Sequence, residues 1–204
     1  MVRRYVQRAR AESAQATRRQ ILDAAREALL DPEGLDAGLA SIASRARVAR
    51  STVYATFGSR GALFAELADE TVHAAGVDAV IEAFRGPEPV AALETSIAAS
   101  CRMYAADRDA FARLLALGQT DPETTEPLSR GDRDRRFGMD DLVRRLDEAG
   151  LLQPGLDRGQ AAASLSVLTT FWAYDELASG RGLDAEACTR VLVQTARTAV
   201  LADP

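Results

Sequence analysis

The chain has 204 residues, of which 47% are apolar and 27% charged, and its formal net charge is −5, a balance typical of a folded globular protein rather than a disordered one. No run of about 18 apolar residues is present, so no membrane-spanning helix is expected. The basic first residues are not followed by an apolar stretch, which argues against a secretory signal and favours a cytoplasmic location.

The charge is divided unevenly along the chain. Residues 1–60 hold eleven arginines and six acidic residues, a net charge of +5, whereas residues 61–204 hold fourteen arginines and twenty-four acidic residues, a net charge of −10. A basic head on an acidic body is typical of a nucleic-acid-binding domain joined to a domain that does not bind nucleic acid. The predicted domains are therefore 1–60 and 61–204.

The first helix is predicted over residues 17–30, after a basic arm at residues 1–15. Such an arm either reaches phosphates and a minor groove or is a solvated terminus, and both interpretations stay open. Asp31-Pro32 and Gly34 are expected to end the helix. The arginines of the arm and the buried stripe of the helix are Arg3, Arg4, Arg8, Arg10 and Ile21, Leu22, Ala25, Ala28, Leu29.

Residues 39–67 predict two short helices joined by a tight turn, followed by the start of a third helix. The first has apolar residues at the spacing of one buried face, and Val53 and Phe57 form the inner face of the second. The outer face of the second helix, residues 50–57, carries hydroxyls, an aromatic ring and a guanidinium, which suit contact with a DNA groove. This geometry is that of a helix-turn-helix. The inner residues of the first helix are Leu39, Ile42, Ala43 and Ala46.

The segment IASRARVARSTVYATFGSR resembles the signature of the TetR/AcrR family of bacterial transcriptional regulators, which is close to IAxxAGVSxxTxYxxFxxK. Together with residues 21–25, the resemblance covers about residues 17–67. It implies an all-α fold of about nine helices, in which 1–60 is a DNA-binding domain and 61–204 a helical effector-binding and dimerisation domain. The matching positions are Ile42, Ala43, Ala46, Val48, Thr52, Tyr54 and Phe57, and Arg60 replaces the usual Lys.

The resemblance implies a repressor that binds double-stranded DNA at a two-fold operator and is released by a small apolar or aromatic effector. Arg50, Ser51 and Ala55 are candidates for base edges, and Thr52, Tyr54 and Arg60 for phosphates, with Arg60 at a helix N-terminus that sits against a phosphate. The full set of expected DNA-binding residues is Arg47, Arg50, Ser51, Thr52, Tyr54, Ala55, Thr56 and Arg60.

Two residues of the turn depart from the family pattern. Arg47 stands where the family has Gly, and Ala49 where it has a capping Ser. A positive φ at Arg47 costs about 1 kcal/mol, and the lost cap costs about as much again. Arg47 can offset this by contacting a phosphate. The alternative hypothesis is a helical ligand-binding protein or small enzyme whose DNA-binding head no longer functions.

The body is predicted to be helical over residues 60–79, 90–107, 109–117, 137–149, 157–179 and 185–201, and residues 125–134 are predicted to be irregular or a frayed helix. Ser59 is expected to cap the first of these helices. In the family the last two helices form a homodimer contact, although they can also simply complete the core of one chain. The residues expected at the dimer interface are Leu165, Leu168, Val191, Leu192 and Thr195.

An effector pocket is expected among the large side chains of the body helices, which alternatively form an ordinary core. His73 is the only histidine, and Cys101 and Cys188 lie far apart in the sequence, as expected of reduced thiols. No metal-ligand spacing, phosphate loop or nucleophile motif is found, so neither an enzyme nor a metal or other cofactor is expected. The expected pocket residues are Met103, Tyr104, Phe111, Phe137, Phe171, Trp172 and Tyr174.

Overall fold

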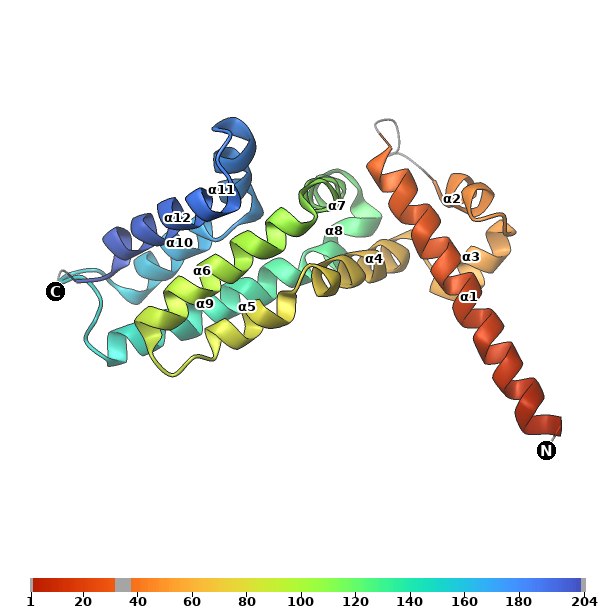
Figure 1. Ribbon diagram of the computed structural model, residues 1–204, viewed down its shortest axis with the longest axis horizontal. Coiled ribbons are helices and arrows are strands. Elements are labelled where there is room, and N and C mark those ends of the chain that lie inside the picture. Colours follow the sequence, from red (N-terminus) through yellow and green to blue (C-terminus); the bar gives the residue numbers. More distant parts are fainter. Residues whose placement is uncertain (1, 32–37, 203–204) are drawn as a thin grey trace. The chain divides into compact units, whose positions relative to one another are not determined.

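The computed structural model describes residues 2–31 and 38–202, with side chains from Ala11 onward (Figure 1). Over these residues the chain is helical and contains no strand, which confirms the all-α prediction. The helices are α1 (Val2–Leu30), α2 (Leu39–Arg45), α3 (Arg50–Phe57), α4 (Arg60–Ala74), α5 (Val77–Phe84), α6 (Pro89–Ala106), α7 (Arg108–Thr120), α8 (Pro122–Leu128), α9 (Arg130–Glu148), α10 (Arg158–Leu168), α11 (Phe171–Asp175), the π-helical turn η1 (Glu176–Gly180) and α12 (Ala185–Val200).

The chain folds into two compact units, each made of two separate stretches of the sequence. The first contains Met1–Glu70 and Ala112–Leu128, and the second contains Thr71–Phe111 and Ser129–Pro204. The expected DNA-binding domain, residues 1–60, lies within the first unit. That unit also includes most of α7 and all of α8, so the chain passes from one unit to the other three times.

The first unit is built on one apolar cluster. Its inner residues on α1, α2 and α3 are those that the sequence spacing predicts, and all of them are buried. Leu114 and Leu117 of α7 join the same cluster, which explains why a segment so distant in sequence belongs to this unit. The cluster comprises Ile21, Leu22, Ala24, Ala25, Ala28, Leu29, Leu39, Ile42, Ala43, Ala46, Val53, Phe57, Leu63, Phe64, Leu67, Leu114 and Leu117.

Helix α1 begins at Val2, well before the predicted start at Thr17. Residues 2–16 contain neither glycine nor proline and are rich in alanine and arginine, which favour a helix even without an apolar stripe. The side chains at 11–16 are exposed. The side chains of the four arginines of the arm, and the predicted helix stop at Pro32 and Gly34, lie outside the described residues.

The first turn of α4 lies directly against α8 within the first unit. Gly61 has no side chain, and a Cβ atom at this position would overlap the carbonyl oxygen of Glu123 and lie 3.3 Å from Cγ of Pro127. The Ser59 hydroxyl accepts a hydrogen bond from the Ala62 amide at 3.0 Å, which confirms Ser59 as the cap. The close approach of the two helices therefore depends on glycine at position 61.

The second unit contains more helices than the expected pattern. Gly76, with φ 92°, ends α4 and separates it from α5, so the predicted helix 60–79 is interrupted. Residues 125–134, predicted to be irregular or a frayed helix, lie largely in α8 and α9 and are therefore helical. The predicted helix 157–179 breaks at Thr169, and the Thr170 hydroxyl caps α11 by accepting from the Ala173 amide at 3.1 Å. These breaks explain why the described chain has more than about nine helices.

Candidate functional site

The turn between α2 and α3 has the hydrogen bonds of a Schellman motif. The Val48 amide donates to the Ala43 carbonyl at 3.0 Å, and the Arg47 amide donates to the Ser44 carbonyl at 3.1 Å. Arg47 occupies the left-handed position of this motif, with φ 52°. Among the described residues no other non-glycine residue has a positive φ. The turn does require the conformation that glycine adopts without strain, and an exposed arginine adopts it here.

Helix α3 presents two different faces. Val53 and Phe57 point into the core of the first unit, as predicted. The outer face carries the expected DNA-binding residues, of which Arg50, Ser51, Tyr54 and Ala55 are exposed and Thr52 and Thr56 half-buried. Ala49 precedes the helix with extended backbone and makes no side-chain capping bond, as its methyl group requires. The residues chosen from the sequence are thus brought together on one surface.

Arg50 and Tyr54 form a pair on this surface. The Arg50 guanidinium donates to the Tyr54 hydroxyl at 3.3 Å and lies 5.4 Å from the ring centroid. Tyr54 is 44% exposed, so its ring and hydroxyl are accessible from solvent. The pair orients a guanidinium and a phenol toward solvent, where both can hydrogen-bond to nucleic acid.

Arg18 of α1 fixes α3 in place, a role that the sequence did not predict. Its Nε donates to Glu66 of α4 at 2.6 Å, and its Nη1 donates to the Thr56 carbonyl near the C-terminal end of α3 at 3.1 Å. The guanidinium also lies 4.6 Å from the ring centroid of Phe57. Arg18 therefore joins three helices and satisfies a carbonyl of the last turn of α3.

An open groove of about 570 Å³ runs between α1 and the outer face of α3. Hydroxyls, an amide and the Arg18 side chain line it together with the methyl groups of Ala14 and Ala55, so its surface is mixed, and its polar groups can hydrogen-bond to a sugar-phosphate chain. The lining residues are Ser13, Ala14, Gln15, Thr17 and Arg18 from α1, and Thr52, Ala55 and Thr56 from α3.

Arg60 is engaged within the protein. Its guanidinium forms an ion pair with Asp121, and the two side chains are only 14% and 20% exposed. The guanidinium also lies 5.0 Å from the ring centroid of Phe64, one turn further along α4. The expected phosphate-binding residue thus lies at the correct helix end but is held by a carboxylate.

The body contains an aromatic cluster that includes five of the seven expected pocket residues. The Tyr104 ring packs edge-on against Phe111 and Phe171, with centroids 5.3 and 5.5 Å away, and its hydroxyl donates to the Thr169 carbonyl at 3.2 Å. Trp172 and Tyr174 contact Phe171 in turn. Burial raises the pKa of Tyr104 to about 12, so its phenol is neutral at physiological pH.

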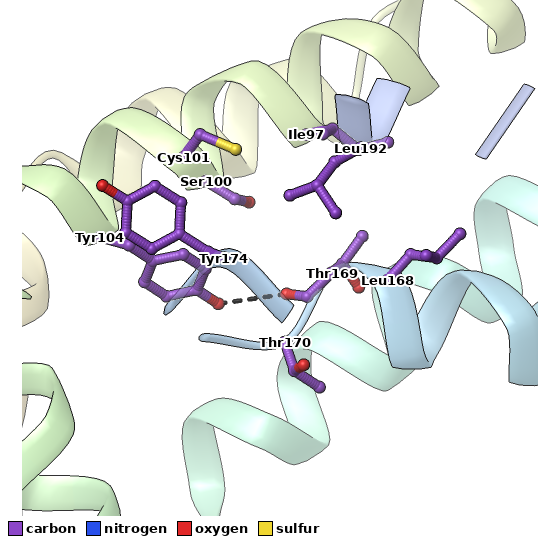
Figure 2. Close-up of a pocket in the computed structure, with 9 residues that line it drawn as sticks. All are labelled: Ile97, Ser100, Cys101, Tyr104, Leu168, Thr169, Thr170, Tyr174 and Leu192. Atoms are coloured by element: carbon purple, nitrogen blue, oxygen red, sulfur yellow. Dashed lines mark hydrogen bonds between the residues drawn. The ribbon is translucent and has the colours of Figure 1, made fainter. Parts of the chain in front are cut away.

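A cavity of about 10 Å³, room for about one water, lies beside Tyr104 (Figure 2). Burial also raises the pKa of the Cys101 thiol, which therefore stays protonated at pH 7. No side chain that lines the cavity is charged at this pH. The Tyr104 hydroxyl points to Thr169, whereas the Tyr174 hydroxyl points away from it. The lining residues are Ile97, Ser100, Cys101, Tyr104, Leu168, Thr169, Thr170, Tyr174 and Leu192.

Two of the expected pocket residues, Phe137 and Met103, do not line the cavity. Phe137 is 76% exposed on α9, because that helix turns its neighbours Met139, Leu142 and Val143 into the core instead. Met103 is buried on α6 but does not line the cavity. Helical spacing alone did not distinguish the inner from the outer aromatic positions.

The expected dimer residues also divide between two environments. Leu165 and Leu192 are 0% and 6% exposed inside their own chain, which corrects their expected place at an interface. Leu168 is half-buried and Thr195 exposed. Val191 is 41% exposed, and Val167 of α10, which was not predicted, is 67% exposed. On α10 the outward apolar residue is thus Val167 rather than Leu165, whereas on α12 two of the three expected residues, Val191 and Thr195, are exposed.

The histidine, the two thiols and the acidic residues do not come together as a catalytic or metal-binding site in the described part of the chain. His73 is exposed in the last turn of α4, where a cationic side chain suits the helix C-terminus. Cys101 and Cys188 are buried free thiols, and burial raises the pKa of each. No cluster of potential metal ligands occurs among the described residues. No helix there is long and apolar enough to cross a membrane.

Comparisons with known proteins identify this architecture. The family model for bacterial regulatory proteins of the tetR family matches residues 21–67. No curated protein sequence matches the chain.

Solved structures share the fold over nearly the whole chain. NalD of Pseudomonas aeruginosa, the secondary repressor of the MexAB-OprM multidrug efflux pump, is 20% identical, with 93% of this chain and 98% of NalD covered and a TM-score of 0.73. SmeT in its triclosan complex is 20% identical, with 92% and 93% covered and a TM-score of 0.70. A TetR-like transcriptional regulator from Rhodococcus sp. RHA1 is 20% identical, with 89% and 94% covered and a TM-score of 0.64.

The helix-turn-helix with its exposed α3 surface, set in an all-α chain, defines a DNA-binding regulator. Residues 21–67 thus match the model of the tetR family of bacterial regulatory proteins, and over nearly its whole length the chain shares the fold of solved TetR-like regulators.

Replacing Arg47 with glycine is expected to stabilise the head by about 1 kcal/mol, because glycine adopts a positive φ without strain. Amide hydrogen exchange in α2 and α3 should slow about fivefold if these amides exchange through local opening. Arg47→Ala is the control, since it removes the same charge but keeps the Cβ. Equal exchange rates in both variants would show that the turn is not strained.

Proposed function

We propose that the protein is a homodimeric repressor that acts in the cytoplasm, binds a two-fold operator and leaves it when a small, neutral, mainly aromatic molecule binds the body. The observation that carries the proposal is the outward Arg50–Tyr54 pair on α3, in the basic head of an acidic chain. An exposed helix with these side chains has little role in a core, and it matches the dimensions of a major groove.

Within each head, α3 enters the major groove. Arg50 and Ser51 lie in its first turn, where recognition helices contact base edges, and Ala55 one turn later offers a methyl group to thymine. Thr52, Thr56 and Tyr54 contact the flanking backbone, as does Arg47 from the turn. The groove between α1 and α3 offers the Arg18 side chain and several hydroxyls to the adjoining sugar-phosphate chain.

The effector binds at the cavity beside Tyr104. Its lining combines apolar side chains with uncharged hydroxyls, which favours a neutral molecule with one or two polar groups. The cavity holds about one water, so the effector must displace side chains when it binds. The break between α10 and α11 at Thr169 is a place where the chain can shift without breaking the hydrogen bonds of a helix. The effector acts through its preference for one arrangement of the two heads over another.

The dimer forms through the outward faces of α10 and α12. These neighbouring helices expose Val167 and Val191 to solvent in the single chain, together with the smaller Thr195. Burying such side chains against a second copy, as in a four-helix bundle, removes apolar surface from water. A two-fold dimer also matches the symmetry of a two-fold operator.

Arg50→Ala and Tyr54→Ala are each expected to weaken operator binding by about 10- to 100-fold, because base and backbone contacts are lost at both half-sites. The operator is first selected from genomic fragments, and affinity is then measured by gel shift at fixed salt. Arg181→Ala is the control, since this side chain is 70% exposed on the second unit. If the wild type selects no sequence, the alternative of a non-functional head is favoured. If both variants bind as the wild type does, α3 is not the recognition helix.

Tyr104→Phe is expected to raise about fivefold the triclosan concentration that releases the operator, because the cavity loses its phenolic donor. Operator affinity without triclosan should not change. Tyr174→Phe is the matched control, because its hydroxyl points away from Thr169. Equal shifts in both variants would contradict this placement, and release by charged but not neutral aromatic molecules would contradict the effector class.

Val167→Asp is expected to convert the dimer to single chains in light-scattering measurements at micromolar concentration, because a carboxylate cannot be buried there without a partner. Ile81→Asp introduces the same charge at a 41% exposed apolar position on α5 and should leave the dimer intact. A dimer that persists in Val167→Asp and dissociates in Ile81→Asp would place the interface elsewhere.

A further inference from the structure

The ion pair between Arg60 and Asp121 has a geometry that bears directly on DNA binding. Arg60 is the first residue of α4, and Asp121 immediately precedes α8, so sixty-one positions in the sequence separate the partners. Both lie in the first unit, and both side chains are largely shielded from solvent. A shielded pair is screened little by salt, which makes it a firmer contact than the exposed pairs elsewhere on the surface.

Asp121 is held in place independently of Arg60. Its Oδ1 accepts a hydrogen bond from the Glu123 amide at 3.0 Å, and its carbonyl accepts from the amides of Thr124 and Thr125, both at 3.0 Å. Its Oδ2 is buried and faces the arginine. The carboxylate is therefore a fixed acceptor at the start of α8.

The backbone at Gly61 allows this contact. The first turn of α4 approaches the Glu123 carbonyl so closely that no side chain fits between them. Arg60 consequently begins next to α8 and is further anchored over the Phe64 ring. In contrast, the preceding Gly58 and Ser59 are exposed, so the end of α4 itself is accessible from solvent.

We propose that Asp121 lowers the DNA affinity of the head by holding Arg60 away from the phosphate that the start of α4 would contact. This inference rests on the proposed function, and it assigns to Asp121, outside the helix-turn-helix, the setting of operator affinity. The phosphate and the carboxylate compete for one guanidinium. Separating the pair would leave a shielded carboxylate without its cation, so in the wild type Arg60 stays on Asp121 and each head binds DNA without this phosphate contact.

Asp121→Asn separates the electrostatic role of Asp121 from its structural one. Asparagine keeps an oxygen that can accept from the Glu123 amide, and asparagine and aspartate cap helices about equally well. Affinity is measured with the full-length protein on its selected operator and on a random-sequence duplex, at several salt concentrations. We expect about tenfold tighter binding on both duplexes, because phosphate contacts carry no sequence information.

The salt dependence of DNA binding distinguishes the electrostatic role of Asp121 from a purely structural role, which would leave that dependence unchanged. One additional phosphate contact in each of two heads should steepen the slope of log K against log salt by about 1.8. Glu123→Gln is the matched control, because it removes the same charge two residues away, from an exposed side chain, and leaves the carboxylate that pairs with Arg60 in place. It should change neither the slope nor the affinity by more than about twofold.

Arg60→Gln tests the same inference without altering Asp121. In the wild-type background it should weaken binding less than about threefold, and in the Asp121→Asn background it should abolish the whole gain. A loss of tenfold or more in the wild-type background would show that Arg60 already contacts phosphate, and would overturn the inference. Unchanged or weaker binding by a folded Asp121→Asn protein would overturn it as well. Because the random duplex is measured too, the result stands apart from whether a specific operator exists.

Discussion

The close contact between the first turn of α4 and the start of α8 is the constraint on which the head depends. Glycine at 61 lets the two backbones approach, and Arg60 and Asp121 then meet at the edge of that contact. Leu114 and Leu117, on the helix before α8, complete the apolar cluster beneath α1–α4. A segment from the middle of the chain is therefore part of the DNA-binding unit rather than of the body.

Around this contact the recognition helix is held from several directions. Arg18 binds its C-terminal carbonyl and reaches Glu66 on α4, while Val53 and Phe57 anchor its inner face. The turn before it is fixed by two Schellman hydrogen bonds, even though Arg47 strains the backbone and Ala49 provides no cap. The surrounding contacts therefore compensate for two locally unfavourable residues, as is common where a backbone is positioned for binding.

The residues of the head were predictable because their spacing follows from helix geometry and the motif spans few residues. The inner faces of α1, α2 and α3 were all correctly identified. Contacts between distant segments were not predictable, since nothing near Asp121 or Glu66 indicates an arginine partner. In the body, Leu165 and Leu192 were placed on the outer face although they are buried, and Phe137 on the inner face although it is exposed. Helices rich in alanine have apolar residues on several faces, so periodicity alone does not orient them.

The position of Asp121 in the chain also relates the ion pair to the segments that connect the two units. α4 and α7 each begin in one unit and end in the other, and α8 is followed at once by α9 of the second unit. Arg60 stands at the head end of α4, and Asp121 lies between α7 and α8. The two partners of the ion pair therefore lie on or next to segments that connect the two units along the chain, whereas α3 is anchored by its inner face in the apolar cluster of the first unit.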